Sequence, residues 1–498
     1  MSDLHQHRPL HDSAASFDVA IVGAGPAGLS AADVLRRYDL DVVLVDEQHR
    51  PGGQILRQPP QGFRVQNWLP AKLYDRVKAL LYSLDGSDEV SWSLGTTVLG
   101  MMEGSPYRTS AGESASHEVW LQRQGRCEVL HAKVVLLAAG CYERPLPFPG
   151  WTLPGVMGAG AIQGFVKSQQ LVPGSRFLLI GHHPLQLIVA DQLLSAGADV
   201  AAVAFTQSLR RAFDVLKVPV VMARHGRQLM ETAKVLTRLK RAGVPVLFET
   251  TIVDAEGEHT VEQARIAPLM SDGSIDHDRS SVIHCDRIGT CYGFLVSSEL
   301  ARQAGAEVTW KENEGGWLVD HDRWFESSVA KLFVAGELTG LAGADAAVEK
   351  GHIAAIGILR ALGRVDIRAA ERLARTSRGR LSRLLSFARA LNVLSSPPQR
   401  LLEHTTTAET ILCRCESLSF GEVQRQLLEH PHVASADAAK LLTRAGMGIC
   451  QGRFCGHNVA GMVARERGLT AAEVGTFHSQ TPVKPVLLRT LQTLVGAD

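Results

Sequence analysis

The six residues GAGPAG near the N-terminus constrain the fold of this chain more than any other feature. They directly follow an apolar strand predicted over 17–22 and precede an alanine-rich helix predicted over 29–38 and a second strand over 41–45. A glycine-rich turn between a strand and a helix is typical of a dinucleotide-binding βαβ unit. We therefore expect an α/β chain whose first domain is Rossmann-like and binds an ADP moiety.

Each glycine of this turn has a separate task. Gly23 permits the tight turn, Gly25 lets a phosphate approach the backbone, and Gly28 lets helix and strand pack closely. The start of the helix supplies N–H groups and positive potential for a pyrophosphate. Asp46 ends the next strand and can accept two hydrogen bonds from a ribose. Glu47 is the neighbouring candidate, although the strand alternation favours Asp46. The turn alone does not distinguish FAD from NAD.

A second βαβ unit begins near residue 176, and its turn, GHHPLQ, keeps only Gly181. His182 and His183 put side chains where a pyrophosphate needs bare backbone, and Leu185 and Gln186 bracket the third glycine position. The histidines are either a metal pair or phosphate-binding cation, or tolerated polar turn residues. The second interpretation is favoured, and the pair has no assigned role. We expect no NAD(P)H binding here and, without a C-x-x-C in this domain, no dithiol relay.

Three further segments favour a flavin: PGGQ at 51–54, AAGCYERP at 138–145 and VAGE at 334–337. Together they resemble the flavoproteins that have two dinucleotide-binding domains. The resemblance implies that the PGGQ glycines approach the flavin side, that the A-A-G turn covers the cofactor, and that the VAGE acid binds the ribityl chain. It adds the following residues to the cofactor-binding set: Pro26, Ala27, Gly53, Gln54, Ala139, Gly140, Gly336 and Glu337.

The composition is that of an ordinary globular protein. The chain has 498 residues, 45% hydrophobic and 21% charged, with a formal net charge of +1. This length is typical of about three domains. The near-neutral charge does not favour nucleic acid or an anionic membrane as a binding partner. No apolar run reaches the ~18 residues that a membrane span needs. Residues 1–16 lack the apolar segment of a secretory signal and are expected to be a disordered tail. We expect a cytoplasmic protein.

Four of the eight cysteines cluster near the C-terminus. CRCE contains Cys413 and Cys415, and CQGRFC contains Cys450 and Cys455. Four soft ligands suit zinc or an iron–sulfur cluster. Zinc sites prefer C-x-x-C, and a neighbouring flavin suggests redox chemistry, so a 2Fe–2S cluster is favoured over zinc, with four structural thiols as a third alternative. The second pair is surrounded by glycines, which can present N–H groups to the sulfides of a cluster: Gly446, Gly448, Gly452 and Gly456. Three basic residues lie nearby and either offset the charge of the cluster or are simply solvated: Lys440, Arg444 and Arg453.

An arginine-rich helix is predicted between the dinucleotide-binding region and the cysteines. Residues 364–389 contain eight arginines but only two acids, Asp366 and Glu371, with leucines at helical spacing. The favoured interpretation is a solvated helix that straps two domains. The alternative is a basic docking face for an acidic electron-transfer partner. SSPPQ at 395–399 ends the helix, and the proline-containing tail is expected to be extended.

The segments CRCE, TRAGMGICQGRFCG and ERPLPFPGWTLPGVMGAGA resemble the larger, α subunits of a bacterial group. This group comprises opine oxidases, hydrogen cyanide synthase and the proline or hydroxyproline dehydrogenases, and is related to the sarcosine oxidase α subunit. The resemblance implies FAD and a bacterioferritin-associated-ferredoxin-like 2Fe–2S domain. It also implies a β subunit similar to D-amino-acid oxidase, a small ferredoxin-like subunit, an FMN at a subunit interface and a peripheral link to the respiratory chain at the inner face of the membrane.

The expected architecture is two Rossmann-like domains of the glutathione-reductase type, one inserted in the other, and a small α-rich 2Fe–2S domain. Their expected bounds are 17–155 with 290–365 for FAD, 156–290 for the degenerate NAD-like domain, 366–405 for the linker helix, 406–475 for the cluster and 476–498 for the extended tail. The expected function is electron transfer within a dehydrogenase or oxidase that acts on a CH–NH group. The alternatives are a self-contained NAD(P)H:acceptor reductase and a nucleotide-binding scaffold. No catalytic acid or base stands out, and the substrate is open among opines, proline, hydroxyproline, glycine and sarcosine-like amines.

Overall fold

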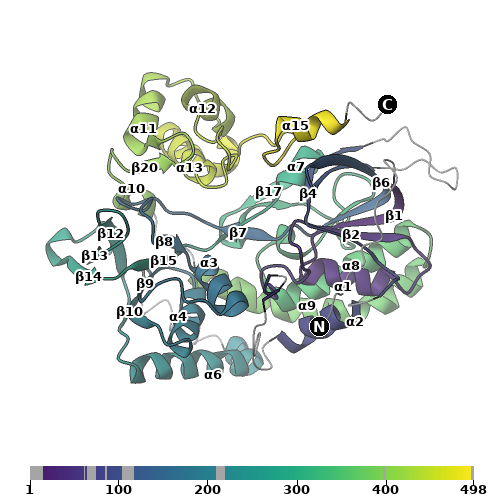
Figure 1. The fold of residues 1–498 in the computed structure, drawn as a ribbon, viewed down its shortest axis with the longest axis horizontal. Helices are drawn as coiled ribbons and strands as arrows, with labels where there is room; N and C mark the ends of the chain where they lie inside the picture. Colours follow the sequence, from purple (N-terminus) through teal and green to yellow (C-terminus); the bar gives the residue numbers. More distant parts are fainter. Residues whose placement is uncertain are drawn as a thin grey trace. The chain divides into compact units, whose positions relative to one another are not determined.

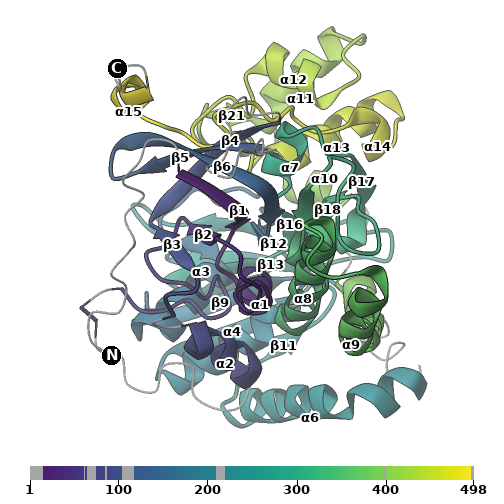
Figure 2. The ribbon, with the colours of Figure 1, turned by 90° about the vertical axis from the view of Figure 1, so that its right-hand side faces the viewer.

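The computed structural model describes residues 15–60, 62–63, 74–84, 87–103, 117–208, 219–395 and 400–494. The chain forms two compact units (Figures 1 and 2). The first comprises Met1–Tyr142, Leu295–Arg389 and His478–Asp498, and the second comprises Glu143–Phe294 and Ala390–Phe477. Most of the expected N-terminal tail (1–14) and of SSPPQ (396–399) lie outside the described residues.

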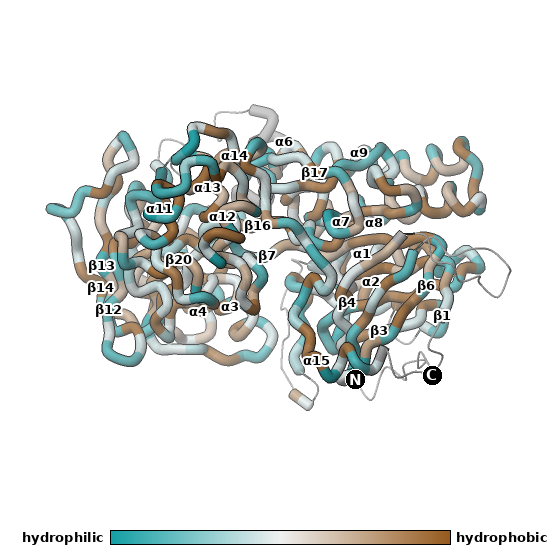
Figure 3. The backbone as a smooth tube through the Cα atoms, turned by 90° about the horizontal axis from the view of Figure 1, so that it is seen from above, coloured by the Kyte–Doolittle hydropathy of each residue, from teal (hydrophilic) through white to brown (hydrophobic). Residues whose placement is uncertain are grey.

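The first unit contains the sheet that GAGPAG predicts. Its order is β3-β2-β1-β6-β5-β4, and β19 pairs with β6. Strands β1, β2, β3, β6 and β19 pair in parallel, whereas β4 and β5 are antiparallel. Hydrophobic residues follow the central strands (Figure 3) because both faces of a parallel sheet are covered. The strands are β1 (Ala15–Val22), β2 (Val42–Asp46), β3 (Ser91–Leu94), β4 (Thr96–Glu103), β5 (His117–Arg123), β6 (Arg126–Leu137) and β19 (Leu332–Val334).

Helices α1 and α8 form the tightest helix pair of this unit (Figure 2). Gly351 of α8 lies so close to the backbone of Ala27 in α1 that a larger side chain would clash with it. Helix α9 follows α8 and buries Ala370, Ala374 and Leu381 in the same core. The helices and the hairpin of the unit are α1 (Pro26–Leu35), α2 (Asp75–Leu84), α7 (Glu299–Gln303), α8 (Ala344–Ala361), α9 (Ile367–Leu394), β17 (Val308–Lys311) and β18 (Gly316–Val319).

The second unit contains a five-stranded sheet in the order β11-β10-β9-β15-β8, with parallel pairing throughout. A three-stranded antiparallel sheet, β12-β13-β14, accompanies it. Strands β7 (Cys141–Glu143) and β16 (Phe294–Val296) lie where the chain passes between the units. The remaining elements are β8 (Val156–Gly158), α3 (Ala159–Gly164), β9 (Arg176–Gly181), α4 (Leu185–Ser195), β10 (Asp199–Phe205), α6 (Pro219–Arg241), β11 (Val246–Leu247), β12 (Thr250–Glu256), β13 (Gln263–Pro268), β14 (Ser281–His284) and β15 (Arg287–Cys291).

The cysteine-rich segment belongs to the second unit and has its own small core, which includes Leu412, Val423, Val459 and Phe477. Ser419 begins α11 with a capping box, in which its side chain accepts the N–H of Glu422. The segment consists mainly of helices: α10 (Leu401–Thr405), β20 (Ile411–Cys413), β21 (Leu418–Ser419), α11 (Phe420–Glu429), α12 (Ala436–Thr443), α13 (Gly456–Arg467) and α14 (Ala471–Val474).

The C-terminal tail corrects one expectation. Residues 478–487 contain no helix or strand, but α15 (Leu488–Leu491) and a 3-10 turn, Gln492–Leu494, follow. The prolines at 482 and 485 disfavour helix only at and before their own positions, and the leucine-rich residues beyond them can form one. Val483 donates its N–H to Leu99 at 2.7 Å, which fixes the tail to the first unit. None of the described helices is long and apolar enough to span a membrane.

Candidate functional site

The turn between β1 and α1 has the geometry that a bound phosphate requires. Gly23 has φ +112°, and a Cβ there would clash with the carbonyl of Ala138. A Cβ on Gly28 would clash with the carbonyl of Gly23, so helix and strand approach as closely as predicted. Gly25 precedes α1 without any side-chain cap, and Pro26 occupies the first helical turn. The N–H groups that begin α1 are therefore directed at an external acceptor.

The acids at the end of β2 are both engaged, in different ways. Asp46 accepts the N–H of Ala24 at 2.6 Å and that of Gln48 at 2.7 Å, so it fastens β2 to the glycine turn. Burial raises the pKa of Asp46 although these N–H groups favour its ionised form. Glu47 is 46% exposed and forms an ion pair with Lys484 of the tail. Glu47 is thus the more accessible of the two carboxylates, and Lys484 is a neighbour that no local sequence pattern indicates.

The other residues of the cofactor-binding set also belong to the first unit. The carbonyl of Ala24 accepts the N–H of Gly52 at 2.8 Å, which brings the PGGQ segment to the turn, and Gln54 is exposed in this segment. Gly53 lies against the backbone of Gly25. Ala139 and Gly140 are partly exposed beyond the end of β6. No atom of the described chain lies within 4 Å of the Cβ position of Gly140, so this turn is open on that side.

Glu337 lies in the 3-10 turn Gly336–Thr339 after β19, and its charge interacts with that of a buried lysine, Lys350, which the motifs did not indicate. Its carboxylate accepts the N–H groups of Ala342 at 3.0 Å and Gly343 at 2.9 Å, and burial raises its pKa. Lys350, on α8, donates to the carbonyls of Gly336 at 3.1 Å and Gly340 at 2.7 Å. Burial lowers the pKa of Lys350 to about 8, against the opposing effect of Glu337 and Glu314.

In the second turn, GHHPLQ, backbone N–H groups donate to a backbone carbonyl. The carbonyl of Cys291, at the end of β15, accepts the N–H of His182 at 3.0 Å and that of His183 at 3.1 Å. Gly181 is required because a Cβ there would clash with the backbone of Cys291, not because a phosphate approaches it. The amides of His182 and His183 therefore already have a backbone acceptor. Gln186 is fully buried at the beginning of α4.

The rings of the two histidines in this turn pack against aromatic side chains. The ring of His182 meets Tyr292 edge-on with centroids 5.6 Å apart, and that of His183 meets Phe294 at 5.1 Å. Burial lowers the pKa of His182 well below its usual value and that of His183 to about 4. Neutral, enclosed rings do not serve as phosphate-binding cations. The interpretation as a cationic pair is not supported by this arrangement.

The four clustered cysteines lie together as two touching pairs. Cys413, at the end of β20, forms a thiol hydrogen bond with Cys455, which directly precedes α13. Cys415 and Cys450 form the second pair, and Cys415 is exposed. The thiol hydrogen bond and N–H groups that include that of Gly446 lower the pKa of Cys413 to about 6, whereas that of Cys455 is raised.

The donor set fits an anionic sulfur site but does not by itself form a metal cage. No group of three or more His, Cys, Asp or Glu side chains among the described residues is arranged around a single point as metal ligands are. All four sulfur atoms nevertheless interact electrostatically, because the pKa of Cys455 responds to each of the other three. Two neighbouring pairs of thiols provide the ligand types, although not the arrangement, of a zinc or iron–sulfur site.

The glycines around the second cysteine pair lie against Phe477 and Cys415. Side chains at Gly446 and Gly452 would clash with the ring of Phe477, and Gly456 lies against the same ring. A side chain at Gly448 would clash with Cys415. Gly446 directs its N–H group at the thiol of Cys413. The glycines mainly make room for Phe477, which no local sequence pattern marks.

The basic residues near the cysteines also have partners. Arg444 forms an ion pair with Glu416 at 3.1 Å, and Lys440 lies 5.5 Å from the centre of the Phe477 ring. Arg453 donates to the carbonyl of Cys450 at 3.3 Å. These contacts fix the residues that surround the thiols.

Comparison with known proteins agrees with this geometry. Residues 17–351 match the family described as pyridine nucleotide-disulphide oxidoreductase. One opine oxidase subunit, from Agrobacterium tumefaciens (strain Ach5), is 31% identical over 494 residues, which cover 96% of this chain and 92% of that protein. The chain belongs to the pyridine nucleotide-disulphide oxidoreductase family, in the group that contains this opine oxidase subunit. Hydrogen cyanide synthase subunit HcnB of Pseudomonas aeruginosa is also 31% identical, covering 95% of this chain and 98% of its own.

Solved structures support the fold of this family member. The L-proline dehydrogenase from P. horikoshii matches with a TM-score of 0.67 and 20% identity, covering 96% of this chain and 80% of its own. The α/β Rossmann-type fold and the resemblance expected from the sequence are thus confirmed. Membership of this family and of the group that contains the opine oxidase subunit identifies the chain as an oxidoreductase-type protein.

Proposed function

We propose that this chain is the electron-transferring subunit of a multisubunit dehydrogenase or oxidase that acts on the CH–NH group of an amino acid, imino acid or opine. The first site would hold FAD, the four clustered cysteines would hold a 2Fe–2S cluster, and a flavoprotein partner similar to D-amino-acid oxidase would oxidise the substrate. Oxidation of a CH–NH group to an imine releases two electrons and two protons. When bound, a flavin would accept or donate one or two electrons, and a 2Fe–2S cluster would transfer one at a time.

The observation that carries this proposal is the hydrogen bonding of the second turn. Because the carbonyl of Cys291 accepts the N–H groups of both His182 and His183, the second Rossmann unit offers no turn for the pyrophosphate of NAD(P)H. Electrons would therefore reach this chain from another subunit. The names of the relatives support this proposal, since the opine oxidase and hydrogen cyanide synthase relatives are each named as one subunit of an enzyme.

The residues of the first site suit a dinucleotide in their chemistry. The uncapped start of α1 would face the pyrophosphate, and Glu47 and Asp46 lie where a ribose would be bound. Glu337 would accept hydrogen bonds from the hydroxyl groups of the ribityl chain, in a position that Lys350 fixes through the carbonyls of Gly336 and Gly340. No substrate-directed acid or base is assigned, because the substrate chemistry is proposed to lie in the partner.

Rapid mixing with reduced nicotinamide nucleotides tests the origin of the electrons. The purified protein is mixed with stoichiometric NADH or NADPH while flavin absorbance is followed, and the amine substrate is supplied to the assembled complex as the positive control. We expect no fast bleaching by either nucleotide. Rapid bleaching by NADH would favour the self-contained reductase and overturn the proposal.

Cofactor analysis tests the two proposed sites separately. Denaturation of the protein should release FAD, whereas release of ATP or NAD without flavin would indicate a nucleotide-binding scaffold. Cys450→Ser should remove the cluster absorption and the bound iron and sulfide, whereas Cys285→Ser, at a buried cysteine of the same unit outside the cluster motif, should not. Unchanged iron and sulfide in Cys450→Ser would remove the ligand assignment.

A further inference from the structure

Helix α9 has one face that the first unit buries and one face that no described residue covers. Ala370, Ala374, Ser377, Leu381 and Ala388 are its buried residues, and they repeat every three, four or seven positions. A helix advances about 100° per residue, so these positions form a single stripe. The small side chains allow α9 to lie close to α8, where Ser377 and His352 are hydrogen bonded at 3.2 Å.

The opposite face of α9 carries a stripe of arginines. By the same geometry four of these side chains point away from the buried stripe and Arg389 lies at its side; all five are exposed: Arg368, Arg372, Arg375, Arg383 and Arg389. The one carboxylate of the helix, Glu371, already binds Arg323 at 2.9 Å and also binds Arg378. None of the five exposed arginines forms an ion pair with another residue in the part of the chain that the structure describes. We call these five residues the arginine face.

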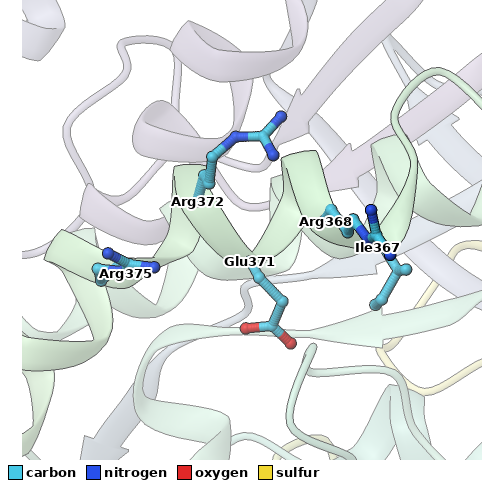
Figure 4. A pocket seen from close by; sticks show the side chains of 5 residues that line it. All are labelled: Ile367, Arg368, Glu371, Arg372 and Arg375. Carbon is cyan, nitrogen blue, oxygen red and sulfur yellow. The ribbon is translucent and has the colours of Figure 1, made fainter.

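A shallow surface depression lies on this part of the helix. Its volume is about 400 Å³, and Ile367, Arg368, Glu371, Arg372 and Arg375 line it. Figure 4 shows the three arginines along successive turns of α9, with the carboxylate of Glu371 directed away from Arg372. Several guanidinium groups without counter-ions therefore border one recess, an arrangement that attracts carboxylates or phosphates.

The arginine face differs from an ordinary solvated helix surface. Solvated helices commonly alternate acids and bases four residues apart, which stabilises them, whereas arginines at three- and four-residue spacing repel one another. Helix α9 has such spacings from Arg368 to Arg372 and from Arg372 to Arg375. The formal charge of the whole chain is only +1, so the concentration of charge is local. An external anionic surface would relieve this repulsion.

We propose that the arginine face of α9 binds an acidic surface of a partner subunit. This inference rests on the proposed function, because it names a docking site for one of the subunits that the proposal requires. Guanidinium groups bind carboxylates in a bidentate manner, so several arginines can fix the orientation of a partner as well as attract it. All eight basic residues over 364–389 are arginine and none is lysine, in agreement with this geometry.

An anionic membrane is the less suitable occupant. A helix that lies in a membrane interface inserts an apolar face, and the apolar face of α9 is buried in the protein. The exposed apolar residues near the depression are Ile367 and Leu373, at 45% and 43% exposure. Both lie at the edges of the arginine face and do not form a continuous strip within it.

The test uses the complex isolated with its native partner subunits. The variant Arg368→Glu, Arg372→Glu, Arg375→Glu is compared with the wild type by mass photometry across a KCl series. We expect the wild-type complex to dissociate progressively with salt. The variant should show a dissociation constant raised about tenfold or more at low salt, and a weaker salt dependence.

A matched control carries the same change of charge at exposed arginines outside α9. The control variant is Arg126→Glu, Arg241→Glu, Arg279→Glu. It should assemble like the wild type, which separates docking from net charge. Circular dichroism and thermal unfolding of both variants show that each is folded, and crosslinking between α9 and acidic residues of the partner locates the contact.

The outcomes distinguish the inference from the proposed function. If the wild type associates with its partners and the α9 variant associates equally well, docking at α9 is overturned while the proposed function stands. If the wild type has no partner subunit even at low salt, both are overturned. If the variant loses flotation with phosphatidylglycerol vesicles but keeps its partners, the arginine face binds lipid and the inference is overturned.

Discussion

Lys350 allows a quantitative test of how the first unit holds the turn at Gly336–Gly340. Lys350 is only 2% exposed, and its ammonium group donates to the carbonyls of Gly336 and Gly340. Burial lowers the pKa of Lys350 from 10.5 to about 8, although Glu337 and Glu314 favour the charged form. The perturbation is Lys350→Met, which keeps a long side chain but removes the titrating group.

The sign of the pH dependence follows from proton binding. Below about pH 8 both the folded and the unfolded chain carry the proton on Lys350, and between about 8 and 10.5 only the unfolded chain does. The stability of the wild type relative to the variant is therefore greatest above 10.5 and is lost as pH falls through about 8. Each pKa unit corresponds to about 1.4 kcal/mol, so the relative stability should rise by about 2 kcal/mol between about pH 8 and about pH 9.5.

Thermal unfolding by calorimetry across this range is the assay. For a unit of this size, the gain corresponds to an increase of about 4–8 °C in the Tm of the wild type relative to Lys350→Met. Lys311→Met, at an exposed lysine of the same unit, is the control and should follow the wild type. Parallel pH dependences of the wild type and Lys350→Met would refute the reasoning.

Three further substitutions test other parts of the structure. Gly53→Ala places a Cβ 2.8 Å from Cα of Gly25 at a φ of +60°, so we expect a loss of about 1–3 kcal/mol and reduced retention of the first-site nucleotide, measured by cofactor content. Phe477→Ala should lower stability by about 3–5 kcal/mol and reduce iron and sulfide content, with unchanged content contradicting the role of this ring. Trp324→Ala, which removes a ring 4.2 Å from the guanidinium of Arg378, should cost about 3–5 kcal/mol in thermal unfolding; an unchanged Tm would exclude it as an anchor of α9.

Features encoded by neighbouring residues were predictable from the sequence. The β1–turn–α1 unit follows from apolar periodicity and glycine spacing within about twenty residues, and GHHPLQ lies in the strand-to-helix turn between β9 and α4, as its sequence predicts. The same local reasoning placed the helix of α9, whose buried residues fall at helical spacing. These predictions succeed because backbone sterics and one-sided burial act over short distances.

Features that depend on distant residues were not predictable. Lys484 pairs with Glu47 although 437 residues separate them, and the acceptor for the amides of His182 and His183 is a backbone carbonyl that any residue at 291 would supply. The ring of Phe477 occupies the space beside Gly446 and Gly452, where a Cβ would clash with it. In each case the chain topology brings the partner into contact, and the local composition gives no signal of it.

The hydrogen bonds of the second turn have a consequence for any attempt to engineer nicotinamide dependence into this protein. Substituting glycines for His182, His183 and Gln186 would clear the side chains but leave the carbonyl of Cys291 on the turn amides. Because that acceptor is main chain, no replacement at position 291 removes it, and the end of β15 would have to move. Under the proposed function, a gain of NAD(P)H use would therefore require a coordinated change of the backbone at the end of β15, which single substitutions do not produce.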